Sequence, residues 1–221
     1  MTSPRKRVVA FISGGGSNML ALAKAAEAAD FPAEIVAVFS DKTEAGGLAK
    51  AEALGIATRT FLRRDFAGKE AHEAAILDAL DALSPDLICL AGYMRLLSGA
   101  FIRRYEGRIL NIHPSLLPLF PGLHTHQRAL DAGMRIAGCT VHFVTEGMDE
   151  GPAIVQAAVP VLPTDTADTL AARVLTVEHK SYPLALRIVA EGRMRMEGGK
   201  AVATGSLLAM DGAYLISPAA V

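Results

Sequence analysis

The sequence predicts an α/β fold in which a mostly parallel, twisted sheet carries helices on both faces, with antiparallel additions towards the C-terminus. In the first half of the chain, short and continuously apolar runs alternate with longer segments whose apolar residues recur at helical spacing. This alternation is typical of a parallel sheet that is buried on both faces. Hydrophobic residues make up 51% of the 221 residues, so the chain can bury a sizeable core. Together these observations favour a Rossmann-like architecture.

The first half of the chain alternates expected strands and expected helices. The strands are expected at residues 7–13, 34–40, 57–61, 86–91 and 108–112. The helices are expected between them, at residues 18–29, 48–54 and 69–83. Connections between parallel strands of one sheet should be right-handed.

After Pro114 the pattern changes. The expected elements are a short helix at 127–132, longer strands at 136–144 and 153–161, a long helix at 166–191 and a hairpin turning at 198–199. Asp165 or Thr166 is a suitable N-cap for the long helix, and Pro183 is expected to kink or divide it. No repeat or linker separates the two halves, so residues 1–221 are expected to form a single domain on one sheet.

Charge and cysteine content narrow the classes of function. The formal net charge of -1 and the sequence pI of about 6.6 argue against a nucleic-acid partner, which needs a basic surface. No apolar run has the length of a membrane span, and the start does not resemble a secretory leader. Cys89 and Cys139 each lie in an apolar run, which favours buried, reduced thiols. We therefore expect a cytoplasmic monomer or homodimer that acts on small molecules, without membrane or metal.

A glycine-rich segment, Ser13 to Asn18 (SGGGSN), follows the first expected strand and opens the first expected helix. Glycines there let backbone N–H groups face an anion, and the helix N-terminus adds a favourable dipole. No Gly-Lys-Ser/Thr follows, so the segment is not a Walker loop. Ser17 and Asn18 could equally cap the helix without any ligand. Phosphate binding and simple capping both stay open at this point.

The run Ile109 to Pro118 (ILNIHPSLLP) places two polar residues in an otherwise apolar strand. Asn111 and His113 are separated by one residue, so both side chains point to one face of the strand. Ligands of an open parallel sheet gather beyond the carboxyl ends of its strands. The Pro-rich loop that follows, residues 113–126 (HPSLLPLFPGLHTH), is stiff and suited to holding a fixed geometry. A lone His would more often satisfy loop backbone groups, but the amide on the same face favours a site.

Asp149 lies in a turn with flanking glycines, GMDEG, between two expected strands. A solvated Asp is common in such turns. A functional role needs a partner, and a carboxylate near His113 would favour the charged imidazolium and fix its orientation. The remaining histidines, which show no zinc-like spacing, are His124, His126, His142 and His179.

Several motifs, in their order and spacing, resemble the phosphoribosylglycinamide formyltransferases of the folate-dependent formyltransferase family. They are SGGGSN, AGYMRLLS, LNIHPSLLPLFPGLHTHQRAL, GCTVHFVTEGMDEGP and EHKSYP. The resemblance runs from Arg7 to about Gly192 and so covers nearly the whole chain. The Asn-x-His-Pro-Ser-Leu-Leu-Pro run with a later Asp is shared by all folate-dependent formyltransferases. The Gly-rich loop and PGLHTHQRAL are more particular to the purine enzymes.

The resemblance implies transfer of the formyl group of 10-formyltetrahydrofolate to the amine of glycinamide ribonucleotide (GAR), in purine biosynthesis. The amine would attack the formyl carbon directly, through a tetrahedral intermediate, with neither a covalent enzyme intermediate nor a metal. Asn111 would donate an N–H to the developing oxyanion, which His113, as the imidazolium, would also stabilise. Asp149 would keep His113 charged and accept the proton of the attacking amine, through water.

The resemblance also implies binding residues. GAR would contact Gly15, Gly16, Ser17 and Asn18 through its phosphate, and Glu178 through its ribose. The folate would contact Lys69, Met94, Arg95, Leu96, Leu97, Asn111, Glu146, Gly147 and Asp149. Residues 1–113 would thus form the nucleotide- and phosphate-binding half, and residues 114–221 the folate-binding and C-terminal half.

Two positions depart from the pattern of the bacterial enzymes. Leu175 stands where a Gln is expected one helical turn before Glu178, so one contact with GAR would be missing. Lys69 stands where an Arg is expected. A Lys can still pair with the glutamate tail of folate, but it lacks the bidentate fork of Arg.

Three other interpretations stay open. A hydrolase that releases formate from the same folate would resemble this chain around Asn111, but is expected to carry a regulatory domain before the strand at Arg7. A formyltransferase acting on another amine, such as methionyl-tRNA or a sugar nucleotide, is expected to carry a further domain after Gly192. A non-catalytic nucleotide-binding domain would need the Gly-rich loop, but not the Asn, His and Asp together.

Overall fold

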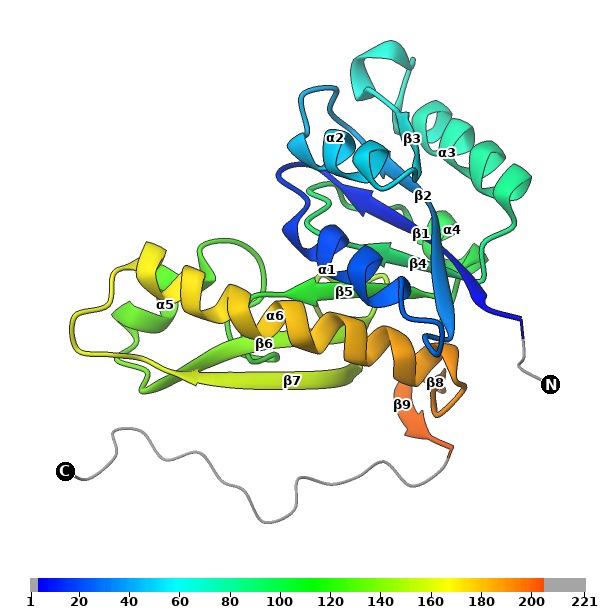
Figure 1. Cartoon of the computed structure of the whole chain (residues 1–221). Coiled ribbons are helices and arrows are strands. Elements are labelled where there is room, and N and C mark those ends of the chain that lie inside the picture. Colours follow the sequence, from blue (N-terminus) through cyan, green and yellow to red (C-terminus); the bar gives the residue numbers. More distant parts are fainter. Residues whose placement is uncertain (1–3, 205–221) are drawn as a thin grey trace.

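The structure, a computed structural model that describes residues 4–204, is built around one seven-stranded sheet (Figure 1). Its strands are β1 (Lys6–Ile12), β2 (Ala33–Ser40), β3 (Ala57–Thr60), β4 (Leu87–Leu90), β5 (Ile109–His113), β6 (Ile136–Phe143) and β7 (Ala153–Pro160). Their spatial order is β3-β2-β1-β4-β5-β6-β7. Neighbours from β3 to β5 are parallel, whereas β6 is antiparallel to both β5 and β7. The expected mostly parallel α/β sheet is confirmed, and strands from both halves of the chain share it.

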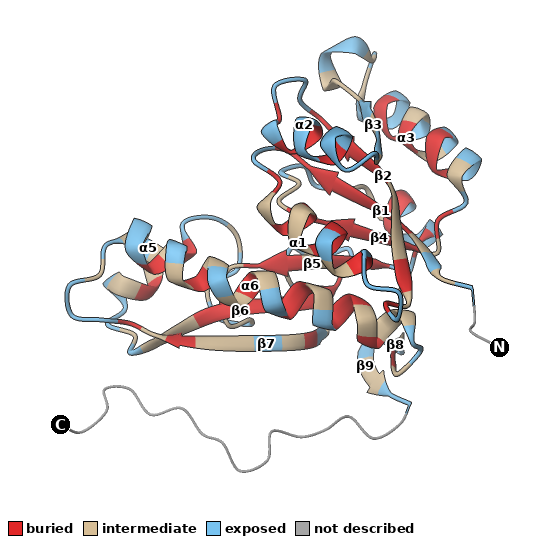
Figure 2. Ribbon diagram, viewed as in Figure 1, coloured by how far each residue is buried: buried red, intermediate tan, exposed pale blue. Residues whose placement is uncertain are grey.

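Helices cover both faces of this sheet. They are α1 (Ser17–Ala26), α2 (Gly46–Ala53), α3 (Lys69–Leu83), α4 (Gly99–Arg104), α5 (Thr125–Asp131), α6 (Ala167–Ala190) and the single-turn η1 (Arg63–Asp65). Side chains of α1, α2 and α6 form the core on one face, and those of α3 and α4 form the core on the other. Along β1, Val8 and Ala10 belong to the first core, and Val9 and Phe11 to the second. Figure 2 accordingly shows the central strands buried along most of their length, which explains their unbroken apolar sequences.

Helix α6 begins with a capping box, in which Thr166 and Thr169 each accept a bond from the other's backbone N–H. Thr166 is therefore the N-cap, and Asp165, the other candidate, bonds the backbone N–H of Leu162 instead. The helix runs without a break through Pro183, so it is not divided there.

The packing of Tyr182 explains why α6 continues past the proline. This side chain is fully buried, and its hydroxyl lies 3.1 Å from the carbonyl oxygen of Leu90 and 3.0 Å from that of Leu110. The helix is thus fixed to β4 and β5 next to Pro183, where a proline removes one helical hydrogen bond. Tertiary packing therefore outweighs the tendency of proline to interrupt a helix.

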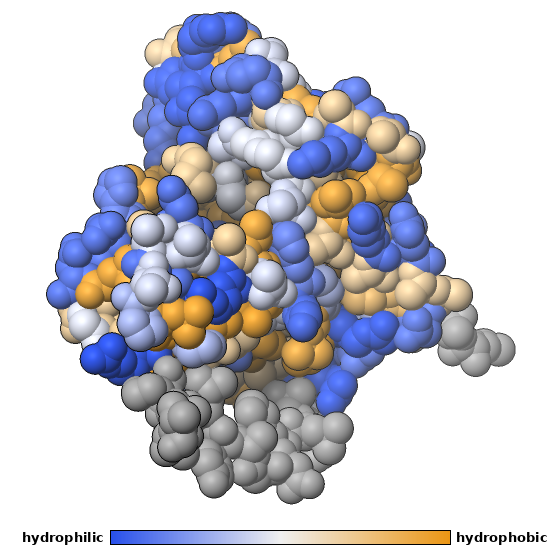
Figure 3. All heavy atoms as spheres, turned by 60° about the vertical axis from the view of Figure 1, so that its left-hand side comes forward, coloured by the Kyte–Doolittle hydropathy of each residue, from blue (hydrophilic) through white to orange (hydrophobic). Residues whose placement is uncertain are grey.

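Two short elements, η1 and α4, lie outside the expected set. Helix α4 starts after Ser98, whose hydroxyl accepts the N–H of Phe101. The C-terminal hairpin is the expected one, with β8 (Met194–Glu197) and β9 (Lys200–Ala203) joined at Gly198 and Gly199. Within residues 4–204, no helix is long and apolar enough to span a bilayer. On the face shown in Figure 3, hydrophobic patches are interspersed with hydrophilic side chains.

Candidate active site

Asn111, His113 and Asp149 meet at the end of β5. All three line one cavity of about 320 Å³. The Nδ1 atom of His113 lies 3.3 Å from Oδ2 of Asp149. The structure therefore gives the turn aspartate the histidine partner that a functional role requires.

Both ring nitrogens of His113 face acceptors. Nδ1 faces the Asp149 carboxylate, and Nε2 lies 3.0 Å from the carbonyl oxygen of Phe120. Carboxylate and carbonyl oxygens only accept, so this arrangement suits an imidazolium with a proton on each nitrogen. The residue is only 6% exposed. The Pro-rich loop and Asp149 together fix the orientation of the ring.

Asp149 adopts a left-handed backbone conformation, with a φ of 56°. Asp is among the few residue types that tolerate this region. The turn is held because the N–H of Gly122 donates to Oδ2 of Asp149 at 2.8 Å. The same oxygen faces His113, so one carboxylate joins the β6–β7 turn, the Pro-rich loop and β5.

His142 completes the site, although it entered the sequence analysis only as a histidine without zinc-like spacing. Its Nδ1 lies 2.9 Å from the carbonyl oxygen of Phe143 and must carry a proton, since that oxygen only accepts. Burial is the largest influence on the pKa of His142 and lowers it, so the ring is neutral near pH 7. Its bare Nε2 then accepts the amide N–H of Asn111, whose Nδ2 is 3.1 Å away. One N–H of Asn111 is thereby left for the cavity.

The position of His142 follows from the sheet. It lies directly opposite Asn111 in the antiparallel ladder of β5 and β6. A pair of polar residues that face each other across two apolar strands indicates a site. The sequence contains both residues, but their pairing can be recognised only once the strand register is known.

A second cavity, of about 360 Å³, adjoins the first, and Asn111 and Asp149 line both. Every residue that the resemblance assigns to folate lines one cavity or both. These residues are Lys69, Met94, Arg95, Leu96, Leu97, Asn111, Glu146, Gly147 and Asp149. The carboxylate of Glu146 pairs with Arg103, so it is turned towards α4. Exposed apolar side chains at the cavities include Met94 and Leu96, which are 66% and 67% accessible.

The Gly-rich loop packs against the start of α2. Gly16 has a φ of 68° and is the N-cap of α1, which receives no side-chain cap from the described residues. Ser17 and Asn18 therefore do not cap the helix, and first-turn N–H groups stay available to an anion. A Cβ atom at Gly16 would lie 2.6 Å from the Cα of Gly47, so glycine is required there. The ammonium of Lys50, on α2, donates to the carbonyl of Gly15 at 2.7 Å.

Asn18 and Glu178 bring the Gly-rich loop and α6 together. The amide of Asn18 donates to Oε2 of Glu178 at 2.7 Å, and both residues are buried. Burial raises the pKa of Glu178, while Asn18 and the neighbouring His179 and His113 act in the opposite direction. Oδ1 of Asn18 is buried and has no hydrogen-bond partner among the residues that the structure describes. A buried polar atom without a partner is costly, so this oxygen is suited to a ligand donor.

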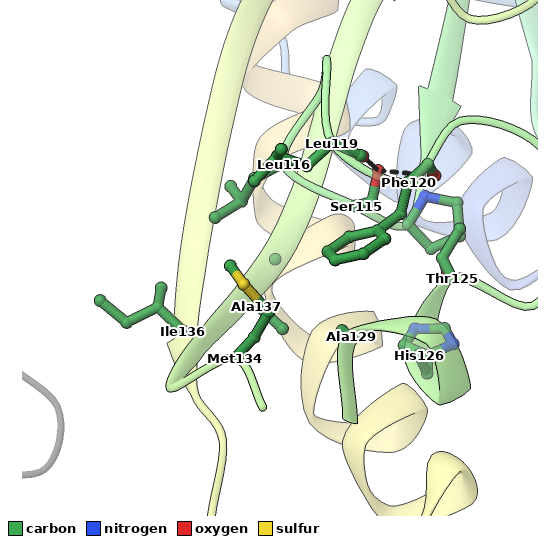
Figure 4. A pocket seen from close by; sticks show the side chains of 12 residues that line it. Ser115, Leu116, Leu119, Phe120, Thr125, His126, Ala129, Met134, Ile136 and Ala137 are labelled. Carbon is green, nitrogen blue, oxygen red and sulfur yellow. Dashed lines mark hydrogen bonds between the residues drawn. The ribbon is translucent and has the colours of Figure 1, made fainter. Parts of the chain in front are cut away.

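A third cavity, of about 10 Å³, lies behind the Pro-rich loop (Figure 4). It holds about one water at most, so it is too small for a substrate. On its rim, the hydroxyl of Ser115 donates to the carbonyl oxygens of Leu119 and Phe120 at 2.6 and 3.2 Å. These bonds shape the loop that presents the Phe120 carbonyl to His113. No group of three potential metal ligands occurs within the described part of the chain.

The sheet changes from parallel to antiparallel at β5, where the Asn, His and Asp meet beside two cavities. The family model for formyl transferase matches residues 6–186. The chain therefore belongs to the formyl transferase family.

Within that family the chain groups with the phosphoribosylglycinamide formyltransferases. It is 45% identical over 205 residues to the phosphoribosylglycinamide formyltransferase of Escherichia coli (strain K12), and the match covers 93% of this chain and 97% of that protein. A crystal structure of phosphoribosylglycinamide formyltransferase from Brucella melitensis shares 71% identity with a TM-score of 0.82, over 93% of this chain and 100% of that one. A formyltetrahydrofolate deformylase from Pseudomonas syringae pv. tomato has the same fold, with a TM-score of 0.84, but only 26% identity. It covers 91% of this chain and 67% of its own.

Proposed function

We propose that this protein transfers the formyl group of 10-formyltetrahydrofolate to the amine of GAR, giving formyl-GAR and tetrahydrofolate. The observation that carries this function is the meeting of Asn111, His113 and Asp149 where the two cavities adjoin. The much lower identity to the deformylase, with which the chain shares its fold, makes formyl transfer to water the weaker alternative.

The folate supplies the formyl group, and side chains of the protein stabilise the charges that develop during its transfer. The lone pair of the GAR amine forms a bond to the formyl carbon, and the carbonyl electrons move to oxygen. An N–H of Asn111 and the positive charge of His113 stabilise this oxyanion, and one such donor is typically worth about a hundred- to a thousand-fold in rate. Asp149 accepts the amine proton through water. The electrons of the oxyanion then re-form the carbonyl as the bond to the folate nitrogen breaks, and that nitrogen takes up the proton that Asp149 had accepted, returned through water.

The acceptor side is proposed to consist of Gly15, Gly16, Ser17, Asn18 and Glu178. The uncapped N-terminus of α1 suits the phosphate of GAR, and the nearby ammonium of Lys50 adds a positive charge. Leu175 offers GAR no hydrogen-bond donor, so the contact expected from a Gln at this position is missing. The carboxylate of Glu178 would accept from ribose hydroxyls beside Asn18.

The donor side is proposed to be the cavity of about 360 Å³. Its lining combines aliphatic walls such as Leu97 and Val144 with backbone groups that could bond a pterin edge. Lys69 lies at this cavity, 50% exposed, and could pair with the glutamate tail of folate. We propose that residues 1–221 form one domain, in which residues 1–113 supply the Gly-rich loop that holds the phosphate of GAR, and residues 114–221 complete the folate site and add Glu178 to the GAR site.

We further propose that the enzyme works in the cytoplasm. Cys89 and Cys139 are buried and free, and reduced thiols are typical of that compartment.

A spectrophotometric assay tests the function. Purified protein is mixed with 10-formyltetrahydrofolate, with and without GAR, and the deformylated folate is followed. Turnover that requires GAR is expected. Equal turnover without GAR would identify a hydrolase, and turnover only with another amine would identify a different acceptor.

A further inference from the structure

Residues 91–98, between β4 and α4, form much of the proposed donor site, although they have no regular secondary structure. Arg95, Leu96 and Leu97 in this segment line the cavity of about 360 Å³. An irregular segment has no helical or sheet ladder of its own to define its shape. Its shape must therefore depend on contacts with other parts of the molecule.

The first end of the segment is held by Asp41, which follows β2. The hydroxyl of Ser13 donates to Oδ1 of Asp41 at 2.6 Å, and the backbone N–H of Met94 donates to the Ser13 hydroxyl at 2.8 Å. A hydroxyl has a single proton, so donation to Asp41 turns the lone pairs of Ser13 towards Met94. The other carboxylate oxygen of Asp41 lies 2.7 Å from Nε of Arg95. The Asp41 side chain is only 3% exposed.

The other end of the segment is held by Glu73, on α3. The backbone N–H of Ser98 donates to Oε1 of Glu73 at 2.8 Å, and the Ser98 hydroxyl bonds Oε2. The same hydroxyl caps α4 by accepting the N–H of Phe101. Glu73 is 7% exposed, so this carboxylate is also buried.

We propose that Asp41 and Glu73 are positioning residues for the formyl donor, each holding one end of residues 91–98 in the shape that binds folate. Neither residue lines the cavities of about 320 and 360 Å³, so Asp41 acts through the segment. Glu73 acts through the segment and also through Lys69, whose ammonium lies 3.8 Å from its carboxylate. A buried carboxylate that loses its hydrogen-bond donors is strongly disfavoured. Displacement of the segment would take Arg95 away from Asp41 and both Ser98 donors away from Glu73, and the pairing therefore stabilises the binding shape. This inference rests on the proposed function.

The chemistry of Asp41 suggests a nearly isosteric test. In Asp41→Asn, the single amide oxygen cannot accept from both Ser13 and Arg95. If the amide oxygen accepts from Ser13, the NH₂ group faces the guanidinium of Arg95, which only donates, and that contact is lost; if it accepts from Arg95, the Ser13 hydroxyl must turn its proton away and accept from the NH₂ group. The shape of the side chain is kept, but in both orientations Arg95 loses its charged partner.

The experiment compares Asp41→Asn and Glu73→Ala with the wild type by steady-state kinetics and by calorimetric titration with tetrahydrofolate. Both variants should raise the KM for 10-formyltetrahydrofolate and the Kd for tetrahydrofolate about tenfold, with kcat and the KM for GAR within about twofold. Asp81→Asn is the matched control. Asp81 also lies on α3 and pairs with an arginine, Arg104, but both partners are about half exposed, so no change is expected.

An unchanged folate KM and Kd in both variants would overturn the proposal. An equal rise in the KM values for GAR and folate would also overturn it, because it would indicate a general loss of structure. If either variant fails to fold, Ser13→Ala replaces Asp41→Asn and Ser98→Ala replaces Glu73→Ala. Ser13→Ala removes a hydroxyl link to Asp41, whereas Ser98→Ala removes a link to Glu73 together with the cap of α4, and both must give the same selective effect. The calorimetric Kd separates this inference from the proposed function, because tetrahydrofolate binding is measurable even if GAR proves not to be the acceptor.

Discussion

The Nδ1 atom of His113 lies 3.3 Å from Oδ2 of Asp149, although one residue ends β5 and the other belongs to the turn after β6. The N–H of Gly122 shares the same carboxylate oxygen. The contact therefore depends on the turn and the Pro-rich loop being folded together. It places the His113 ring against a half-buried carboxylate that lines both cavities.

Asp149→Asn should lower kcat at least about a hundredfold, because it removes the proton acceptor and the counter-ion of His113. The KM for GAR should change only a few-fold, since the phosphate and ribose contacts are elsewhere. Steady-state assays at saturating folate measure both constants. Glu150→Gln is the control, because Glu150 is the exposed neighbour. A kcat for Asp149→Asn within twofold of the wild type would contradict the mechanism.

His142→Gln should lower kcat about fivefold, the equivalent of about 1 kcal/mol for a lost hydrogen bond. The physical reason is that the neutral ring orients the amide of Asn111 towards the oxyanion. In a background of Asn111→Ala, the His142 substitution should have no further effect on kcat. Additive effects of the two substitutions would show that His142 does not act through Asn111.

Lys50→Met should raise the KM for GAR about tenfold, because a charged hydrogen bond to the phosphate is lost. The KM for the folate should not change, since Lys50 lies at the Gly-rich loop. Lys24→Met, which alters an exposed lysine of α1, is the matched control. Equal GAR affinity for Lys50→Met and the wild type at low and high salt would rule out a phosphate contact.

Glu178→Gln should weaken GAR binding and yet stabilise the fold near neutral pH. Burial raises the pKa of Glu178, so its contribution to stability is present below the pKa of the unfolded chain and is lost as pH rises through the raised value. A glutamine does not ionise, so its contribution to the free energy of unfolding does not change over this pH range. Urea unfolding at pH 4 and pH 8 measures the free energy of unfolding. The variant should be more stable relative to the wild type at pH 8 than at pH 4. If the variant and the wild type differ in free energy of unfolding by the same amount at both pH values, the pKa of Glu178 is not raised.

The two thiols should not react in the folded protein. Burial raises the pKa of Cys89 to about 12 and that of Cys139 to about 11. Each unit lowers the thiolate fraction at pH 8 about tenfold, and the thiolate is the reactive form. A disulfide reagent should therefore modify neither thiol at pH 8 until urea unfolds the protein. Rapid labelling without denaturant would show that one thiol is accessible.

The sheet could be predicted from sequence because its central strands are buried on both faces and so have unbroken apolar runs. Strand β1 was expected at residues 7–13 and is Lys6–Ile12, and β5 was expected at 108–112 and is Ile109–His113. Helix α4 could not be predicted, since its six residues are too few to show helical periodicity. Local preference predicted that Pro183 would kink or divide α6, and the helix is not divided there because the buried Tyr182 fixes it to the sheet.

The site could be predicted only in part. The shared face of Asn111 and His113 follows from strand alternation. The approach of Asp149 does not, because it depends on a left-handed turn held by a distant N–H. The role of His142 requires the register of β5 and β6. The bond between Ser13 and Asp41 likewise joins the ends of two strands that no local pattern relates.

The contact between Gly16 and Gly47 limits how this scaffold can be re-engineered. A methyl group on Gly47 would lie 2.6 Å from a side-chain atom of Ile12 and 2.9 Å from the Cα of Gly16, so neither glycine has room to vary. Laboratory evolution towards a different amine would have to keep the proposed phosphate-binding end and alter only the walls around the proposed ribose and amine sites. New acceptors selected on this scaffold should therefore be phosphorylated amines.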